Sequence, residues 1–172
     1  MIDLLRKRRS VRKFESRSIE PDKIEVLKEA LLRSPTSRSL IPWEFVLVDD
    51  LALLKQLSRS KKHGSGFLKG APLGIVVCAD PAKCDVWIED CAIASILVQM
   101  TALSLGLGSC WIQIRLRQFD TKTTSEEYIR KTLSLPSHLT ILSMIAIGYP
   151  AEFPEPVLLS ELPTGKIHSN GW

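Results

Sequence analysis

The sequence predicts a single domain in which helices and strands are mixed, and three observations lead to this class. The chain has 172 residues, which is enough to bury a core without disulfides. An alternating segment at 44–48 and apolar runs at 73–79 and 138–149 are typical of strands. The uncharged stretch 91–114 is long enough for a central helix and a fourth strand, because its two glycines fall where a helix should end.

The N-terminal residues predict a short helix at 2–7 whose C-terminal end is unusually basic. Four arginines and two lysines crowd into the eight positions 6–13. One interpretation is a solvated basic turn that complements a helix C-terminus. Another is a phosphate clamp, in which guanidinium groups and the hydroxyl of Ser10 donate several hydrogen bonds to one phosphate. A third, an arm on nucleic acid, lacks interleaved aromatic residues and a second basic patch.

The first strand follows a helix and a loop of changing polarity. A helix at about 21–34 ends at Pro35, because proline disfavours helical backbone in the residue before it. The loop 35–42 is polar at first and then abruptly apolar. Trp43, for which core packing is the favoured interpretation, leads into the strand at 44–48.

The middle of the chain predicts a helix, a loop and a buried strand in succession. Two aspartates cap a helix at about 51–59, and 60–66 is a basic loop that contains glycine. The strand at 73–79 is a continuous apolar run, which indicates burial on both faces. Asp80 is the expected N-cap on the approach to the central helix, with Pro81 in its first turn.

The central helix is predicted at about 86–105 and the strand after it at about 109–115. A helix that is apolar on most of its circumference must be buried on most of it, and a second copy of the same helix could cover it. A membrane span is disfavoured, because polar residues recur along the stretch and no second candidate segment exists: Ser95, Gln99, Thr101, Ser104, Ser109 and Gln113.

The last third of the chain predicts a helix, a strand and an extended tail. A modest amphipathic helix at about 124–133 precedes the strand at 138–149. Four prolines make the tail at 151–172 and its approach extended rather than helical. The tail still carries large apolar side chains, which need a surface such as a neighbouring subunit: Val157, Leu158, Leu159, Ile167 and Trp172.

Composition and charge limit the function classes. A net charge of +4 permits an anionic ligand without indicating nucleic acid. The four cysteines show no CxxC spacing and no paired histidines, so no metal site is expected, and they resemble buried thiols of a reducing cytoplasm. The charges at the N-terminus follow a very short apolar start, which is the wrong order for a signal peptide. No Ser/His/Asp triad or carboxylate pair is evident, and the three histidines are expected at the surface.

Five blocks of sequence resemble the FMN-dependent nitroreductase family, in particular its short members. They agree in order and spacing and span nearly the whole chain: RRSVRKF at 8–14, SPTSRSLIPWEFVLV at 34–48, WIEDCAIA from Trp87, GLGSCWI at 106–112 and AIGYPAE at 146–152. The resemblance implies a single FMN-binding domain over 1–172 with an α+β fold, a central, mostly antiparallel β-sheet flanked by helices. It also implies a homodimer, with the central helix at the interface and the C-terminal tail wrapped around the partner.

The same resemblance implies two FMN sites, each built from both chains. Its cofactor-binding positions fall into four groups: Arg8, Arg9 and Ser10 at the phosphate and ribityl chain; Arg12 at the pyrimidine edge; Pro35, Thr36, Ser37 and Ser39 in a loop from the other subunit; and Trp111, Ile112, Gln113 and Ile114 in the strand beneath the ring, whose backbone faces its N5 edge. The chain departs from many members by carrying Ser39 and Ile41 in place of Asn and Gln. After the GYP motif, Lys166 is the candidate second cation for the phosphate, with His168 behind it.

The implied activity is an NAD(P)H-dependent flavin oxidoreductase. No side chain is expected to be catalytic, because the flavin carries the chemistry, and Arg12 would stabilise its reduced form. NADH or NADPH would reduce FMN and leave, and a nitroaromatic, quinone or similar small acceptor would take its place in a ping-pong mechanism. Two alternatives stay open: a flavoenzyme of the same superfamily with dehalogenase, dehydrogenase or flavin-fragmenting chemistry, and a non-enzymatic module that binds an anion or nucleic acid. The expected location is the cytoplasm, with no membrane and no nucleic-acid partner.

Overall fold

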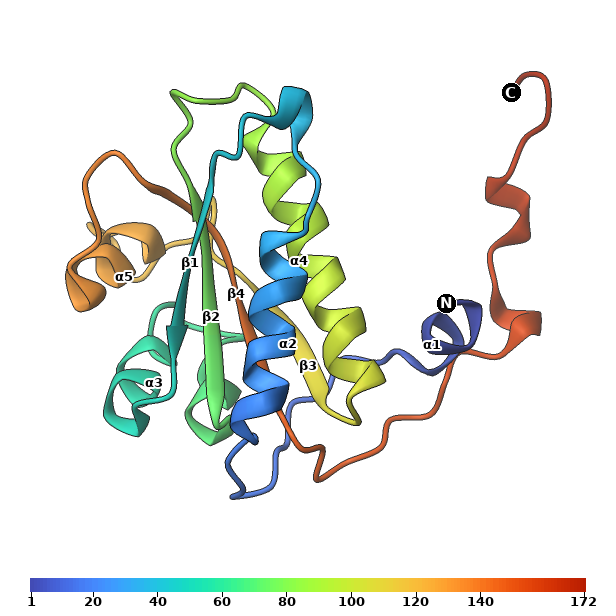
Figure 1. Ribbon diagram of the computed structural model, residues 1–172, viewed down its shortest axis with the longest axis horizontal. Helices are drawn as coiled ribbons and strands as arrows, with labels where there is room; N and C mark the ends of the chain where they lie inside the picture. Colours follow the sequence, from blue (N-terminus) through green and yellow to red (C-terminus); the bar gives the residue numbers. More distant parts are fainter.

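A four-stranded antiparallel sheet forms the centre of the molecule, which is described by a computed structural model of residues 1–172 (Figure 1). The strands lie in the order β1-β2-β4-β3. Their bounds are Trp43–Val48 for β1, Leu73–Ala79 for β2, Gly108–Gln113 for β3 and Thr140–Gly148 for β4. Every neighbouring pair is antiparallel. The predicted α+β class, a mostly antiparallel sheet flanked by helices, is therefore confirmed.

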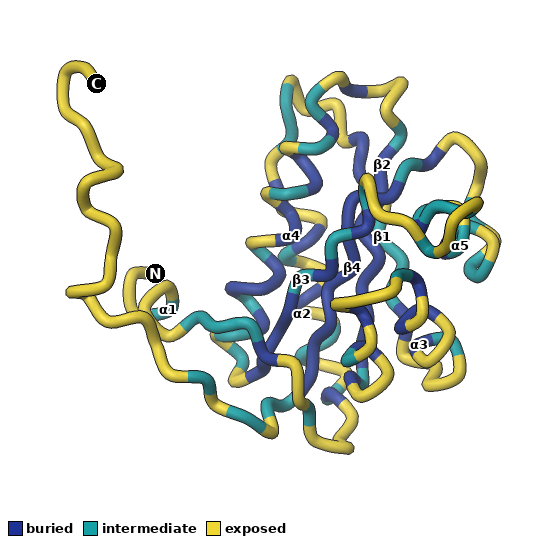
Figure 2. Tube along the Cα trace, turned by 180° about the vertical axis from the view of Figure 1, so that it is seen from behind, coloured by how far each residue is buried: buried dark blue, intermediate teal, exposed yellow.

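Helices cover both faces of this sheet (Figure 1). Their bounds are Pro21–Leu32 for α2 and Trp87–Ser104 for α4 on one face, and Leu51–Leu57 for α3 and Ser125–Leu133 for α5 on the other. Along β2, Ile75 and Val77 join the core beneath α2 and α4, whereas Val76 and Cys78 join the core beneath α3 and α5. All seven residues of β2 are buried, which confirms the predicted burial on both faces (Figure 2).

Two of the helices begin where a preceding side chain caps their first turn. Asp50 caps α3 by accepting a hydrogen bond from the backbone N–H of Leu53 at 2.8 Å. Thr124 and Glu127 form a reciprocal capping box at the start of α5. The predicted core position of Trp43 is confirmed, because only 8% of its surface is exposed.

The central helix begins where the sequence predicted, at about residue 86, but the predicted N-cap role of Asp80 was wrong. α4 begins at Trp87 after the N-cap residue Val86, not after Asp80. The Asp80 carboxylate instead accepts the backbone N–H of Ala82 at 2.9 Å, and the Asp80 carbonyl accepts that of Lys83 at 3.1 Å. The aspartate therefore closes its own tight turn, and the chain needs several more residues to reach the helix.

Both ends of the chain lie apart from the sheet (Figures 1 and 2). α1, Ile2–Lys7, contains no buried residue, and residues 155–172 are all exposed. The tail is extended as predicted except for two short 3₁₀ turns, Leu159–Glu161 and Thr164–Lys166. Its apolar side chains, among them Leu159, Ile167 and Trp172, touch no core of their own chain. The partner surface expected for them stays a prediction.

All four cysteines are buried free thiols, which agrees with the interpretation of their spacing: Cys78, Cys84, Cys91 and Cys110. Burial raises the pKa of the Cys78 and Cys91 thiols to about 12, so neither is a reactive thiolate near neutral pH. No helix has both the length and the apolar character to cross a membrane.

Candidate functional site

The basic segment 8–12 lies beside the edge strand β3. The backbone N–H of Val11 donates to the Ser109 carbonyl at 3.0 Å, and Ser10 forms an isolated bridge with Ser109. On the other side, the N–H of Arg12 donates to the Glu152 carboxylate at 2.9 Å. These bonds fix the segment between the start of β3 and the residues that follow β4.

Gly108 makes this close approach possible. A Cβ atom at position 108 would lie 2.8 Å from the Cβ of Val11, closer than real side chains come. Val11 itself is buried, so it cannot move aside into solvent. Gly108, in the GLGSCWI block, is therefore the residue that lets Val11 pack against β3.

Four of the predicted cofactor-binding residues line one cavity of about 570 Å³. Arg8, Arg9, Ser10 and Arg12 share it with Glu152, Phe153, Pro154 and Val157. Three guanidinium groups against one carboxylate leave two positive charges in the lining. Guanidinium forks next to a serine hydroxyl are a donor set that fits a phosphate group, so this end of the molecule suits the phosphate of FMN.

Further positive charge meets the other end of β3, on Lys61, a residue that the sequence did not point to. The Lys61 ammonium donates to the Gln113 carbonyl at 3.0 Å. Burial lowers the pKa of Lys61, and the positive charge of Arg117 lowers it further. The signal in the sequence was the basic loop at 60–66, but only the fold shows which of its lysines meets β3.

The positive charge of Arg12 acts on Cys110 in the middle of β3. Burial raises the pKa of the Cys110 thiol, and the positive charge of Arg12 opposes that rise. The Arg12 guanidinium also lies 5.8 Å from the centre of the Phe67 ring, a contact that favours one orientation of the side chain.

The strand predicted to lie beneath the flavin ring divides its side chains between two environments. Ile112 and Ile114 are completely buried in the core beneath α3 and α5. Trp111 and Gln113 are half-buried on the opposite face, where the indole N–H donates to the Gln113 amide oxygen at 3.0 Å. Neither isoleucine side chain faces a ligand, so the role that the resemblance gives these two positions would fall to their backbone.

The predicted loop 35–39 lies far from the basic segment of the same chain. Its Ser37 N–H donates to Asp90 in the first turn of α4, whereas Arg8 and Arg9 share a second cavity with Leu103 and Gly106 at the last turn. The 18 residues of α4 span about 27 Å at 1.5 Å per residue. One chain therefore keeps the two groups at opposite ends of α4.

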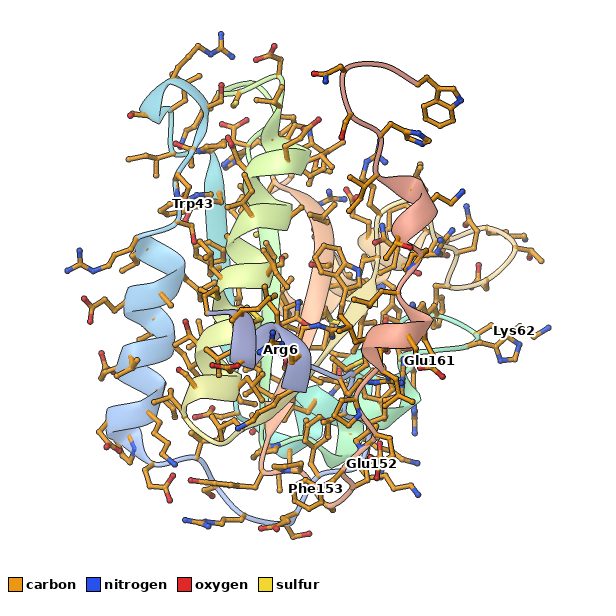
Figure 3. The ribbon with its side chains drawn as sticks, turned by 90° about the vertical axis from the view of Figure 1, so that its right-hand side faces the viewer. Arg6, Trp43, Lys62, Glu152, Phe153 and Glu161 are labelled. Carbon is orange, nitrogen blue, oxygen red and sulfur yellow. The ribbon has the colours of Figure 1, made fainter.

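Figure 3 shows this separation through two landmarks, with Trp43 near one end of α4 and Glu152 near the other. Lys166 lies on the exposed tail and does not line the cavity of the arginines. Its contact with the phosphate stays a prediction.

The antiparallel α+β fold and the arginine-lined cavity beside its edge strand suit the class of proteins that hold an anionic ligand. The comparisons with known proteins make this class specific. The model of the nitroreductase family matches residues 5–149. The chain belongs to the nitroreductase family.

Solved structures agree over the whole chain. An FMN-dependent nitroreductase from Clostridium difficile is 44% identical, with a TM-score of 0.98 and 100% of both chains covered. A protein from Parabacteroides distasonis, provisionally named NADH dehydrogenase/NAD(P)H nitroreductase, is 34% identical with a TM-score of 0.89, covering 99% of this chain and 98% of the other. A curated relative of the same provisional name from Archaeoglobus fulgidus is 32% identical over 149 residues, 84% of this chain and 82% of its own.

Proposed function

We propose that the chain passes reducing equivalents from NADH or NADPH, by way of FMN, to a nitroaromatic, quinone or similar small acceptor in a ping-pong mechanism. The enzyme class, an NAD(P)H-dependent flavin oxidoreductase, follows from the family and from relatives that carry these activities in their names. The observation that carries the proposal is the cavity lined by Arg8, Arg9, Ser10 and Arg12, whose surplus positive charge fits the phosphate of FMN.

The chain's own residues hold and orient the cofactor in this proposal. Arg8, Arg9 and Ser10 donate to the phosphate and ribityl chain, and Arg12 places a fixed cation at the pyrimidine edge. When bound, FMN supplies the hydride and electron chemistry, which no side chain of the protein could replace. The backbone of residues 111–114 carries the ring, and the buried side chains of Ile112 and Ile114 keep that backbone rigid.

The proposal requires two copies of the chain. The loop with Pro35, Thr36, Ser37 and Ser39 lies at the other end of α4, so a second copy must supply it to each cavity. The exposed apolar tail and the exposed Ile93 and Ile96 on α4 support an assembled state, because such side chains gain free energy when a partner covers them. The whole chain, 1–172, then acts as one FMN-binding domain of a homodimer with two sites.

A visible absorption spectrum of the purified protein tests the cofactor, before and after FMN is added. We expect absorption peaks at about 375 and 450 nm, the usual signature of oxidised flavin. Anaerobic titration with NADH and with NADPH should bleach them and identify the donor. A colourless protein that binds no FMN would contradict the proposal.

Steady-state kinetics test the order of events. Varying the nicotinamide at several acceptor concentrations should give parallel double-reciprocal lines, as expected when one product leaves before the second substrate binds. Intersecting lines would show that donor and acceptor bind to the enzyme at the same time, which would contradict the ping-pong mechanism.

A further inference from the structure

The loop between α2 and β1 holds its backbone in a conformation that its residues disfavour. Arg38, Ser39 and Ile41 have φ angles of 54°, 56° and 48°, in the left-handed region. Each is an L-residue with a side chain, and Ile41 is also branched at Cβ, for which this conformation is an outlier. Such a segment keeps its shape only if the surrounding structure imposes it.

Two carboxylates tie this loop to the start of α4: Asp85, exposed, pairs with Arg38, and Asp90, buried, holds the backbone. Asp90, only 3% exposed in the first turn of α4, accepts the backbone N–H of Ser37 at 2.9 Å. Its second oxygen accepts a hydrogen bond from the thiol of Cys84 at 3.4 Å. The loop also closes on itself, because the Thr36 hydroxyl accepts the Ile41 N–H at 3.1 Å.

No basic side chain pairs with Asp90. None of the eight ion pairs of the chain includes it: Arg6–Asp3, Lys13–Glu152, Arg17–Glu20, Lys23–Glu20, Lys28–Glu25, Arg33–Glu29, Arg38–Asp85 and Arg130–Glu126. A buried carboxylate without a cation is costly unless dipoles surround it. Here the Ser37 N–H, the Cys84 thiol and the N-terminal end of an 18-residue helix supply those dipoles. The carboxylate and the loop therefore stabilise each other.

We propose that Asp90 is the positioning residue of the loop 36–41, holding its strained backbone in the conformation that meets the flavin of a second copy. The anchoring follows from the contacts of one chain, and only the link to the flavin rests on the proposed function. A loop ordered in advance lowers the entropy that is lost when the ligand binds. Without the anchor, FMN binding would have to order the loop.

Limited digestion of the cofactor-free protein with trypsin tests the anchoring without flavin. Arg38 is exposed at the tip of the loop, so the rate of cleavage after Arg38, identified by mass spectrometry, reports how often the loop opens. We expect Asp90→Ala to be cut there about tenfold faster than wild type, because a hydrogen bond to a charged group is lost.

Two further variants separate the anchor from a general loss of structure. Asp90→Asn keeps an oxygen that accepts the Ser37 N–H, and should restore slow cleavage. Glu89→Ala removes a carboxylate from the same helical turn, but Glu89 is exposed and forms no ion pair with the loop, so its cleavage should match wild type. Equal cleavage of Asp90→Ala and Glu89→Ala would overturn the proposal.

The cofactor provides the second half of the test. FMN should dissociate about tenfold faster from Asp90→Ala than from Asp90→Asn. An open loop with unchanged FMN release would refute the link to the site while leaving the anchoring intact. A wild-type protein that binds no FMN would instead contradict the proposed function.

If Asp90→Ala does not fold, the donor can be removed from the other side. Ser37 is the first residue of its 3₁₀ turn and follows an extended residue, so Ser37→Pro deletes the N–H where proline is tolerated. Faster cleavage after Arg38 in this variant supports the anchor, and unchanged cleavage overturns it.

Discussion

The two ends of α4 carry the two halves of the proposed site, and they are built in different ways. At the C-terminal end, the segment 8–12 has ordinary backbone, tied to β3 and Glu152, and presents three arginines to one cavity. At the N-terminal end, the loop 36–41 has three residues at positive φ and one buried anchor. The first end supplies charge through several similar groups, whereas the second supplies a backbone shape held by few contacts, of which only the hydrogen bond to Asp90 involves a buried group.

The largest effect should come from removing charge at the C-terminal end. In the double variant Arg8→Ala, Arg9→Ala, we expect the FMN dissociation constant to rise about 100-fold or more, because each charge-assisted hydrogen bond contributes about 1.5–3 kcal/mol. Fluorescence titration at fixed ionic strength measures it. Arg6→Ala is the control, because Arg6 is exposed, pairs with Asp3 at 3.0 Å and does not line that cavity. An unchanged affinity in the double variant would remove the arginines from the site.

Truncation of a β3 side chain should separate stability from binding. Ile112→Ala leaves a hole in the core and should lower the free energy of unfolding by about 2–5 kcal/mol. The FMN affinity of the folded protein should hardly change, because the Ile112 side chain is buried in the core and does not face the proposed site. Urea unfolding and FMN titration measure the two quantities. Leu116→Ala, at a position 78% exposed, should change neither.

A smaller effect should follow from the loss of the lysine that meets β3. In Lys61→Met we expect the FMN affinity to fall about 3- to 10-fold and the midpoint potential of bound FMN to become more negative, because a cation that stabilises the reduced flavin is gone. Potentiometry and titration measure both. Lys62→Met is the matched control, since this neighbour is exposed to solvent (Figure 3). Equal potentials in the two variants would place Lys61 outside the site.

The smallest effect concerns the pH dependence of stability near the C-terminal end of α4. The Tyr149 hydroxyl donates to Glu20 and lowers the pKa of that carboxyl from 4.5 to about 2, with Arg17 contributing less. This carboxylate therefore stabilises the fold above about pH 4.5, and the contribution is lost as the pH falls towards 2. In Tyr149→Phe, the drop in urea midpoint between pH 7 and pH 3 should be slightly smaller than in wild type. An equal drop would mean that the contact is broken in solution.

The sequence predicts most of the fold because its signals are local. Strand runs, the Asp50 cap and the break at Pro35 act within a few residues, and the elements occur where these signals place them. The N-cap of α4 was mispredicted because an aspartate such as Asp80 can either cap a helix or close a turn, and here it closes a turn.

The site is harder to predict because it depends on contacts between distant residues. Arg8, Arg9, Ser10 and Arg12 are neighbours in the sequence and duly share a cavity. The contact of Lys61 with Gln113 joins residues 52 positions apart, and the contact of Asp90 with Ser37 joins residues 53 positions apart. No local sequence pattern predicts either contact. The positive φ angles of Arg38 and Ile41 likewise follow from anchoring by another element, since neither residue favours them.

The central claim, that each site combines the charged end of one chain with the loop of another, can be tested by mixing two defective chains. One carries Arg8→Ala, Arg9→Ala, and the other carries Ser39→Trp, whose ring should block the site from the loop side. After refolding at a ratio of one to one, random pairing should make half of the dimers mixed, each with one intact site, so FMN occupancy should recover to about a quarter of wild type. A mixture that binds no more FMN than its parents would show that each site lies within a single chain.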